Sequence, residues 1–311
     1  MSKGAREVVV VIGSGSIGLA IARRVGAGRT VLLADHSEKA AAAAAERLRS
    51  EGYEVTTRVT DVSDHDAVEA LADAAAALGP VTQVVHTAGV SPAQASIERI
   101  LHVDLVGTAM VLDAFARVVA RGGAGIVIAS MAGHRESPYV PEIEHALVTT
   151  ETSKLLELPF LQPGQVGSTV HAYALSKRAN SLRVQTAAVA WGKRGARVNA
   201  VSPGVIITPL ARDELSGPRG EWFEQVRKVS AAGRFGTPDE VADAAVFLLD
   251  RQAGFITGAD LLMDGGVTAA LRTGEPPDQP GARLQPFITL LSAPGRGAHI
   301  CPLTPRQTEE P

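Results

Sequence analysis

A run of five β-branched residues, Val8–Ile12, leads into a glycine-rich turn and then into a segment of helical character. A β-branched run without polar alternation is typical of a parallel strand that is buried on both faces. Helices must cover such a strand, which restricts the chain to architectures in which strands and helices alternate. The opening therefore predicts the first strand–turn–helix unit of an α/β fold.

The turn after this strand has the spacing G-x-G-x-x-G. Its glycines permit a tight turn and a close approach to a pyrophosphate, and the following helix begins with partial positive charge. A position between a strand and a helix is the context in which this motif indicates dinucleotide binding. We expect the cofactor to contact Gly13, Gly15, Ser16, Ile17 and Gly18.

The second apolar run ends at Asp35, which lies 17 residues beyond Gly18. An acid in this position is expected to bond the ribose 2′-hydroxyl. Its charge would repel a 2′-phosphate, so the sequence predicts NAD as the cofactor. Because His36 follows and softens this discrimination, NADP remains open as the less favoured cofactor.

Strands and helices alternate along the remaining chain. This alternation predicts a doubly wound parallel sheet of the Rossmann type in a single domain, residues 1–271, with ligands at the carboxyl ends of the strands. Further strands are expected over residues 30–34, 53–58, 81–86, 125–129, 197–201 and 261–263, and helices over 37–50, 64–78, 96–121, 173–191 and 238–249.

An insertion over residues 134–168, rich in proline, glutamate and leucine, interrupts this rhythm. Long excursions beside a site are usually functional, so we expect a partly helical, lid-like cover over the substrate. A surface or subunit-contact excursion remains the alternative. The expected apolar face of the cover comprises Leu155, Leu156, Leu158, Phe160 and Leu161; one histidine beside two glutamates, at 142–145, is too little for a metal site.

The segment 272–311 is rich in proline and glycine, which predicts a flexible tail. The single cysteine, Cys301, cannot form an internal disulfide and suits a reducing cytoplasm. A net charge of −3 with interspersed signs gives no basic footprint for nucleic acid. No apolar stretch approaches the roughly 20 residues that a membrane helix needs.

Tyr173 and Lys177 stand four residues apart in a segment of helical pattern, and therefore share one face of the helix. An ammonium group there would stabilise a tyrosinate, so the phenol could exchange a proton near neutral pH rather than near about 10. The pair predicts proton transfer that accompanies hydride transfer.

Together these features resemble the short-chain dehydrogenase/reductases over about residues 7–270. The resemblance implies an oxidoreductase that interconverts a secondary alcohol and a ketone, and Asp35 makes NAD(H) the expected cofactor. The apolar insertion, and the few charged residues that can be assigned to the substrate side, indicate a mid-sized, mostly apolar substrate. The resemblance also implies a homo-oligomer, a dimer or tetramer, with contacts through the Tyr173 helix and the last strand. The matching segments are 13–18, 61–62, 87–89, 130–133, 173–177, 203–208 and 264–266.

The resemblance also implies residue roles. Tyr173 would be the general acid/base, Lys177 would assist it and bind the nicotinamide ribose, and Ser130 would hold the substrate oxygen. The remaining implied cofactor contacts are Asp61 and Val62 at the adenine, Ala88 and Gly89 along the cofactor backbone, and Pro203, Gly204, Ile206 and Thr208 at the nicotinamide carboxamide.

The chain departs from the family pattern at Thr87 and Asp104, where the family usually has asparagines. We expect that threonine at position 87, in place of asparagine, loses a structural hydrogen bond between strands. We expect Asp104 to keep a catalytic proton relay working and to make Lys177 more basic, because a neighbouring anion favours the ammonium form. Two alternatives remain open: an NADPH-dependent ketoreductase of a biosynthetic pathway, and a catalytically silent NAD(H)-binding scaffold.

Overall fold

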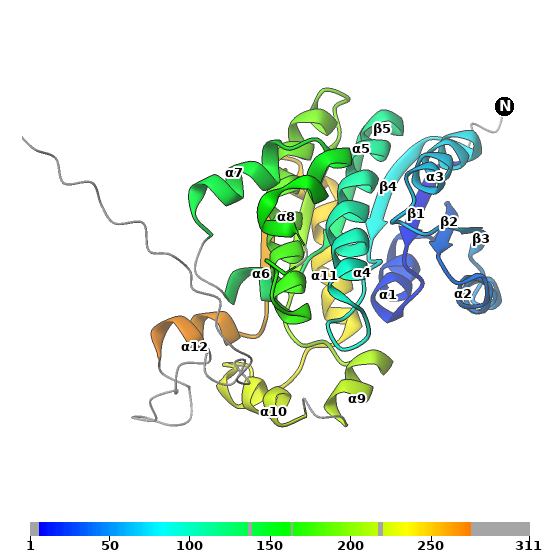
Figure 1. The fold of residues 1–311 in the computed structure, drawn as a ribbon. Coiled ribbons are helices and arrows are strands. Elements are labelled where there is room, and N and C mark those ends of the chain that lie inside the picture. Colours follow the sequence, from blue (N-terminus) through cyan, green and yellow to red (C-terminus); the bar gives the residue numbers. More distant parts are fainter. Residues whose placement is uncertain (1–5, 136–138, 163, 217–219, 275–311) are drawn as a thin grey trace, which may run out of the picture.

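In the described residues, seven parallel strands form one sheet in the order β3-β2-β1-β4-β5-β6-β7 (Figure 1). The computed structural model describes residues 6–135, 139–162, 164–216 and 220–274. The strand order reverses between β1 and β4, which opens a crevice at their carboxyl ends. The strands are β1 Val8–Ile12, β2 Thr30–Asp35, β3 Glu54–Val59, β4 Val81–His86, β5 Val119–Ile128, β6 Arg197–Pro203 and β7 Asp260–Met263.

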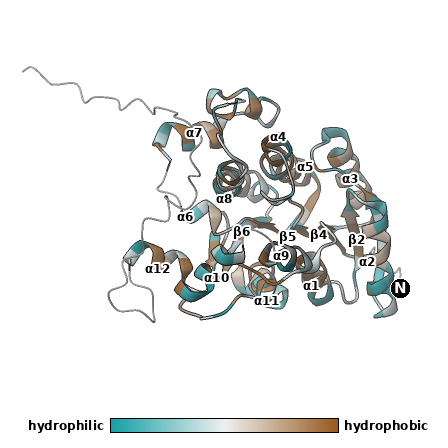
Figure 2. Ribbon diagram, turned by 60° about the horizontal axis from the view of Figure 1, so that its bottom comes forward, coloured by the Kyte–Doolittle hydropathy of each residue, from teal (hydrophilic) through white to brown (hydrophobic). Residues whose placement is uncertain are grey.

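Helices cover both faces of the sheet, as predicted for a doubly wound fold (Figure 2). The first layer comprises α3 His65–Leu78, α4 Ile97–Ile100, the π-helical segment η1 Leu101–Gly107, α5 Thr108–Val118 and α8 Thr169–Gly192. The second comprises α1 Ser16–Val25, α2 Glu38–Ser50 and α11 Pro238–Leu249.

Strand β1 explains why its sequence lacks polar alternation. Val8, Val10 and Ile12 pack into the core beneath the α3, α5 and α8 layer. Val9 and Val11 pack into the opposite core beneath α1, α2 and α11. Successive side chains of a strand point to opposite faces, and here both faces are buried, so every position is apolar.

The helix expected over residues 96–121 is in fact three segments, and it ends earlier than predicted. It runs through α4, η1 and α5 and stops at Val118, where β5 begins. Val119 pairs with Val81, and the register with β4 then shifts before the regular pairing that starts at Ala124. Strand pairing across this irregularity therefore recruits residues that the local pattern assigned to the helix.

The insertion is partly helical, as expected, but its apolar residues face the helices α5 and α8 rather than the crevice. It contains α7 Pro141–Thr149 and the 3-10 segments η2 Thr152–Glu157 and η3 Pro159–Leu161, and follows the short helix α6 Ala132–Arg135. Figure 2 shows α7 outside α8, on the side away from the sheet. The buried cluster that joins the insertion to η1, α5 and α8 includes Leu147, Leu155, Leu161, Val166, Leu105, Leu175 and Leu182.

Polar contacts hold the insertion in this position. The buried Arg183 guanidinium donates to the carbonyl oxygens of Leu147 and Thr150 at 3.0 and 3.1 Å and to Thr152 Oγ1 at 2.8 Å. Thr152 Oγ1 donates to Asp113 Oδ2 at 2.5 Å. The insertion is therefore an integral part of the helical layer.

The carboxyl ends of β6 and β7 are surrounded by α9 Pro209–Leu215, α10 Gly220–Val229 and α12 Val267–Thr273 (Figure 1). The 3-10 segment η4 Arg251–Ala253 follows α11 at the amino end of β6, where Arg197 donates to the carbonyl oxygens of Leu248 and Asp250. Helix α12 extends past residue 271, the predicted domain boundary. The predicted flexible tail from residue 275 onward, with Cys301, lies outside the described residues.

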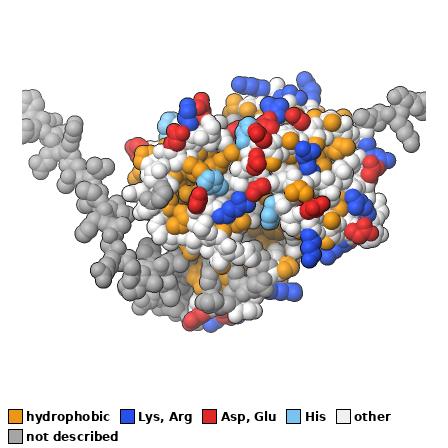
Figure 3. Space-filling view, turned by 45° about the vertical axis from the view of Figure 1, so that its right-hand side comes forward, with side chains coloured by type: hydrophobic (Ala, Val, Ile, Leu, Met, Phe, Trp, Pro, Cys, Tyr) orange, Lys and Arg blue, Asp and Glu red, His pale blue; other side chains and the backbone are white. Residues whose placement is uncertain are grey.

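Two surface properties bear on the expected partners. In the described parts of the chain, no helix combines the length and apolarity that crossing a membrane would require. On the face seen in Figure 3, acidic and basic side chains are interspersed.

Candidate active site

The crevice at the carboxyl ends of β1, β2 and β4 is a cleft of about 820 Å³. The topology brings residues from five separate segments together there, because parallel strands end at the same edge of the sheet. Predicted cofactor residues that line the cleft are Gly13, Gly15, Ser16, Ile17, Gly18, Asp35, Asp61, Val62, Ala88, Gly89 and Thr208.

The glycine turn has the geometry of an anion site. Gly13 adopts a φ of +102°, and a Cβ atom on it would lie 2.5 Å from Thr87 Oγ1. A Cβ on Gly15 would meet nothing within 4 Å, so this side of the turn is open. Gly15 is the N-cap of α1 and provides no side-chain cap, which leaves the first N–H groups of the helix for a ligand. These features fit the pyrophosphate of a dinucleotide.

Thr87 corrects an expectation from the sequence. Its Oγ1 lies 3.1 Å from the carbonyl oxygens of both Ile12 and Gly13, and donates a hydrogen bond to the end of β1. The threonine hydroxyl therefore links the ends of β1 and β4, and the expected loss of a hydrogen bond between strands was wrong.

Asp35 lies at the end of β2 inside the cleft. Its Oδ2 accepts hydrogen bonds from the backbone N–H of Ser14 at 2.9 Å and from Ser14 Oγ at 2.6 Å, and its Oδ1 accepts from Ser37 N–H at 2.9 Å. Burial alone would raise the pKa of Asp35, but these hydrogen bonds outweigh it and hold the pKa below its ordinary value. The cleft therefore contains a fixed negative charge.

Asp61 shares the cleft with Arg99, a residue that the sequence reading did not identify. Arg99 donates to Asp61 Oδ2 at 3.0 Å and to Ser63 Oγ at 2.8 Å. Burial alone would raise the pKa of Asp61, yet bonds from Ser63 and Arg99 keep it below its ordinary value. Arg99 has no sequence signature, because its pairing partner is on a different strand–helix unit.

Helix α8 carries Tyr173 and Lys177 on one face. It begins at Thr169, where the N-cap Ser168 accepts a hydrogen bond from His171 N–H at 3.1 Å. The Lys177 ammonium lies 5.4 Å from the centroid of the Tyr173 ring. Tyr173 is partly exposed toward a pocket, whereas Lys177 is buried behind it.

Asp104 is fully buried beside this lysine. Its Oδ1 lies 3.5 Å from Lys177 Nζ and accepts a hydrogen bond from Val90 N–H at 3.1 Å. Burial alone would lower the pKa of Lys177, but Asp104 and Tyr173 outweigh it and raise the pKa above its ordinary value. Burial raises the pKa of Asp104, and Lys177 offsets only part of that rise.

The π-helical segment η1 places Asp104 in this position, and π-bulges are frequent at functional sites. Thr108 Oγ1 donates to the Asp104 carbonyl oxygen at 2.9 Å, and His86 Nε2 lies 3.1 Å from Thr108 Oγ1. Since the hydroxyl already donates to the carbonyl, His86 Nε2–H is the donor to the hydroxyl. Burial, helped by Lys177, lowers the pKa of His86 to about 3, so its ring is neutral at neutral pH.

A smaller pocket of about 190 Å³ adjoins the cleft at Thr208, which lines both. Ser130 and Tyr173 lie in its wall, and Ser130 Oγ accepts a hydrogen bond from Ala132 N–H at 3.1 Å. Its other walls are mainly apolar: Met131, Ala132, Val170, Val205, Ile206, Trp222 and Phe223.

The described residues of the insertion contribute nothing to the wall of this pocket. The expected placement of residues 155–161 over the substrate was therefore wrong. Part of the apolar wall comes instead from α10, where the rings of Trp222 and Phe223 are in edge contact with centroids 4.8 Å apart. The sequence analysis did not predict these two residues as part of the site. The one available signal was the scarcity of tryptophan, of which the chain has two residues.

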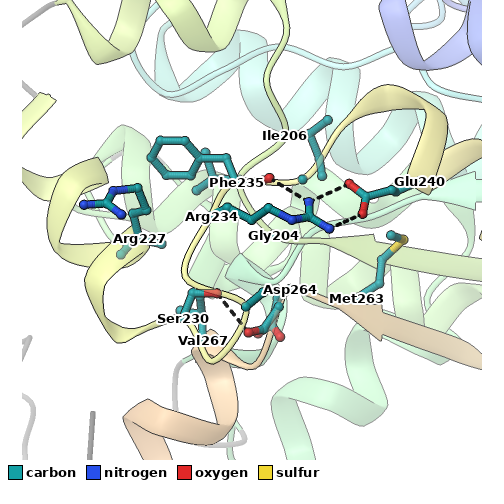
Figure 4. Close-up of a pocket in the computed structure, with 15 residues that line it drawn as sticks. Gly204, Ile206, Arg227, Ser230, Arg234, Phe235, Glu240, Met263, Asp264 and Val267 are labelled. Carbon is teal, nitrogen blue, oxygen red and sulfur yellow. Dashed lines mark hydrogen bonds and ion pairs between the residues drawn. The ribbon is translucent and has the colours of Figure 1, made fainter. Parts of the chain in front are cut away.

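The segment after β6 is held by backbone hydrogen bonds on both sides. Gly204 N–H donates to Met263 O at 3.0 Å, and Gly236 N–H donates to Val205 O at 2.9 Å. Figure 4 shows the region behind this segment, where Arg234 pairs with Glu240 at 2.6 Å. Gly204, Ile206 and Thr208 line the pocket, whereas Pro203 is buried in β6 and lines neither the pocket nor the cleft.

Two family models match the chain. One, described as short chain dehydrogenase, matches residues 7–142. The other, described as enoyl-(acyl carrier protein) reductase, matches residues 140–268.

Individual proteins are similar to this chain over nearly the whole of their own length. The short-chain dehydrogenase/reductase bsc3 of Alternaria brassicicola is 40% identical over 86% of this chain and 97% of its own. The cis-4-hydroxycyclohexanecarboxylate dehydrogenase of Sinomonas cyclohexanicum is 32% identical over 85% and 98%. A solved structure, the 3-alpha-hydroxysteroid dehydrogenase of Pseudomonas sp. B-0831 complexed with NADH, is 29% identical over 86% and 99%, with a TM-score of 0.69.

Proposed function

The chain belongs to the short-chain dehydrogenase/reductase family, oxidoreductases that act on CH–OH groups with NAD(P), and we propose that it interconverts a secondary alcohol and a ketone with NAD(H). One observation carries the proposal. Tyr173 lies in a pocket that adjoins the dinucleotide cleft, with the buried Lys177 ammonium one helical turn behind it.

Each polar side chain at the site has its own role in the proposed proton transfer. The bound dinucleotide supplies or accepts the hydride. Tyr173 donates its hydroxyl proton to the substrate carbonyl oxygen during reduction and takes a proton from the alcohol during oxidation. Ser130 hydrogen-bonds the substrate oxygen beside Tyr173. Lys177 stabilises the tyrosinate, and Asp104 keeps the lysine protonated.

Asp35 supports NAD as the preferred cofactor. Its carboxylate is ionised and fixed by Ser14 and Ser37, so a 2′-phosphate in this part of the cleft would meet a negative charge. One contact supports the NADPH-dependent alternative: His36 Nδ1 lies 3.1 Å from Asp35 Oδ1, and a protonated imidazole there would offset the repulsion.

The pocket walls support a mostly apolar substrate. Met131, Val170 and the Trp222–Phe223 pair surround the position that faces Ser130 and Tyr173. A ketone with an aliphatic or alicyclic body would bury its carbon skeleton there and direct its oxygen to the two hydroxyl groups. The cyclohexanecarboxylate and hydroxysteroid dehydrogenases among the relatives carry names of alicyclic substrates.

A second copy of the chain would meet the β7 side of the sheet. In the described sheet β7 is an edge strand, Leu261 on it is 39% exposed, and the nearby Phe255 is fully exposed. The outer face of α8, where the family resemblance placed another contact, is covered by the insertion. The proposed assembly is therefore a homo-oligomer that pairs through β7.

The test is turnover on a panel of ketones that begins with cyclohexanone, with NADH and NADPH compared. Tyr173→Phe should lower kcat/KM by about 100-fold or more, because the proton donor is lost. Tyr53→Phe is the matched control, since its hydroxyl bonds Arg23 O outside the site. Binding of NADH without turnover by the unsubstituted protein would favour the silent scaffold. Full activity of Tyr173→Phe would exclude the proposed role of the phenol.

A further inference from the structure

We propose that His134 and Asp260 are positioning residues of the site, which fix Ser130 relative to helix α8. Neither of them lines the dinucleotide cleft or the smaller pocket, so they act through other residues. The inference rests on the proposed function, in which Ser130 holds the substrate oxygen beside Tyr173. It adds the part of the fold that sets the distance between these two hydroxyl groups.

The Asp260 carboxylate joins three elements that carry the site. Its Oδ2 accepts hydrogen bonds from His134 Nε2, on α6, at 2.8 Å and from Ser181 Oγ, on α8, at 2.5 Å. Its Oδ1 accepts a hydrogen bond from Ser202 Oγ, on β6, at 2.8 Å. The side chains of His134 and Asp260 are only 17% and 11% exposed, so water competes little for these bonds. The carboxylate therefore ties α6, α8 and β6 to strand β7.

Helix α6, which contains His134, orients the Ser130 hydroxyl. Ser130 Oγ accepts a hydrogen bond from Ala132 N–H at 3.1 Å, and Ser130 O accepts one from Gly133 N–H at 3.0 Å. Because Oγ is the acceptor in the first of these bonds, its own proton is left for a substrate oxygen. The direction in which Ser130 donates this proton therefore depends on where α6 lies.

Helix α6 packs directly on the backbone of α8 (Figure 1). Gly133 is the point of contact, since a Cβ atom on it would lie 2.7 Å from Arg178 N and 2.9 Å from Lys177 C. Helix α6 comprises only four residues, Ala132–Arg135, and so short a helix is not stable by its own hydrogen bonds. Contacts with other elements must therefore hold it in place.

The bridge from His134 through Asp260 to Ser181 is such a contact, and it ends on α8 one turn beyond Lys177. Removal of the His134 imidazole would free α6 to shift against α8. Ser130 Oγ would then move relative to Tyr173. Proton transfer to a bound ketone needs closely defined geometry, so even a small shift lowers the rate.

The experiment is a double-mutant cycle on Ser130 and His134, with kcat/KM for cyclohexanone and NADH as the readout. His134→Ala should lower kcat/KM by about tenfold when Ser130 is present. In the Ser130→Ala background the same change should lower it by less than about twofold, because the hydroxyl that His134 positions is already gone. A general loss of active protein would instead lower kcat/KM equally in both backgrounds.

Three further variants complete the experiment. His65→Ala removes a histidine from an exposed pair with Asp66, at 3.1 Å, and should leave kcat/KM unchanged. His134→Gln, whose amide can still donate to Asp260, should recover part of the lost rate. If His134→Ala does not fold, Ser181→Ala removes the α8 end of the same bridge and takes its place in the cycle, with the same expected result.

Binding of NADH, followed by fluorescence, is a second readout. Its Kd should be the same in His134→Ala as in the parent, because His134 lies outside the cleft. Equal losses of kcat/KM in both backgrounds, or an unchanged kcat/KM in His134→Ala, would overturn the inference. Full activity of Ser130→Ala would remove the role of Ser130 and the inference with it. Failure of the proposed acid/base is distinct, since it would appear as retained turnover in Tyr173→Phe.

Discussion

Gly89 and Asp104 meet so closely that a Cβ atom on Gly89 would lie 2.5 Å from Asp104 Oδ1 and 3.3 Å from Lys177 Nζ. The resemblance assigned this glycine to the passage of the cofactor, and Gly89 does line the cleft. The structure adds that the missing side chain also makes room for the buried ion pair. A single position thus serves both the cleft and the proton-transfer residues.

We predict that Gly89→Ala lowers kcat by about 100-fold, because the added methyl displaces the Asp104–Lys177 pair. Gly192→Ala is the matched control, since a Cβ there meets nothing within 4 Å. Steady-state kinetics and thermal unfolding of both variants check the prediction. Equal kcat in Gly89→Ala and in the parent would contradict the close approach.

Asp35→Asn should raise the affinity for NADPH relative to NADH by about tenfold or more, because it removes the negative charge in the cleft. Fluorescence titration with each cofactor measures the two Kd values. Glu46→Gln, the same charge change on the exposed side of α2, serves as control. The assignment of Asp35 fails if the ratio of the two Kd values stays at that of the parent.

Leu155→Ala should destabilise the protein by about 2–5 kcal/mol without changing the substrate KM. Leu155 is fully buried against η1, α5 and α8, and deletion of its side-chain carbons leaves a cavity there. Lys154→Ala, at an exposed neighbouring position, controls for local effects. A raised KM with unchanged free energy of unfolding would restore the lid interpretation of the insertion.

We predict that the Asp260 carboxylate contributes to the stability of the fold at neutral pH and that this contribution is lost in acid. Burial alone would raise the pKa of Asp260, but bonds from His134, Ser181 and Ser202 hold it below the ordinary value of 3.8. A carboxylate whose pKa is lowered in the folded state stabilises the fold at pH values above its ordinary pKa. This stabilisation is lost as the pH falls through the pKa of the folded state.

Asp260→Asn should therefore lower Tm at neutral pH by an amount that corresponds to about 1–3 kcal/mol. The difference in Tm from the parent should shrink below about pH 4. Thermal unfolding across pH, with Asp66→Asn as a nearly fully exposed control, measures this. A pH-independent difference would mean that charge is not the source of the stabilisation.

Phe255→Ser combined with Leu261→Lys should weaken self-association, because both changes remove apolar area from the exposed β7 side. Light scattering over a range of protein concentrations gives the mass of the parent and of the double variant. Val59→Ser, an exposed apolar residue on the opposite edge strand β3, is the control. A monomeric parent, or a double variant with the mass of the parent, would exclude this interface.

The local pattern was sufficient to predict the order of the elements and the dinucleotide turn. The run Val8–Ile12 is apolar at every position because both faces of β1 are buried. Such a pattern can be recognised from neighbouring residues of the sequence alone. The Tyr173–Lys177 spacing was equally readable, because one helical turn places both side chains on one face. In contrast, the end of the helix at Val118 depended on pairing with Val81, which local propensity does not encode.

Residue types and short spacings alone thus determined the α/β class, the glycine turn and the tyrosine–lysine pair. Only the tertiary structure decided that Asp104 meets Lys177, that Thr87 bonds the end of β1 and that Trp222 lines the pocket. It also decided that the insertion packs against α5 and α8. The physical reason is distance along the chain: these contacts join residues on different elements, and the packing of helices on the sheet, rather than any local periodicity, brings them together.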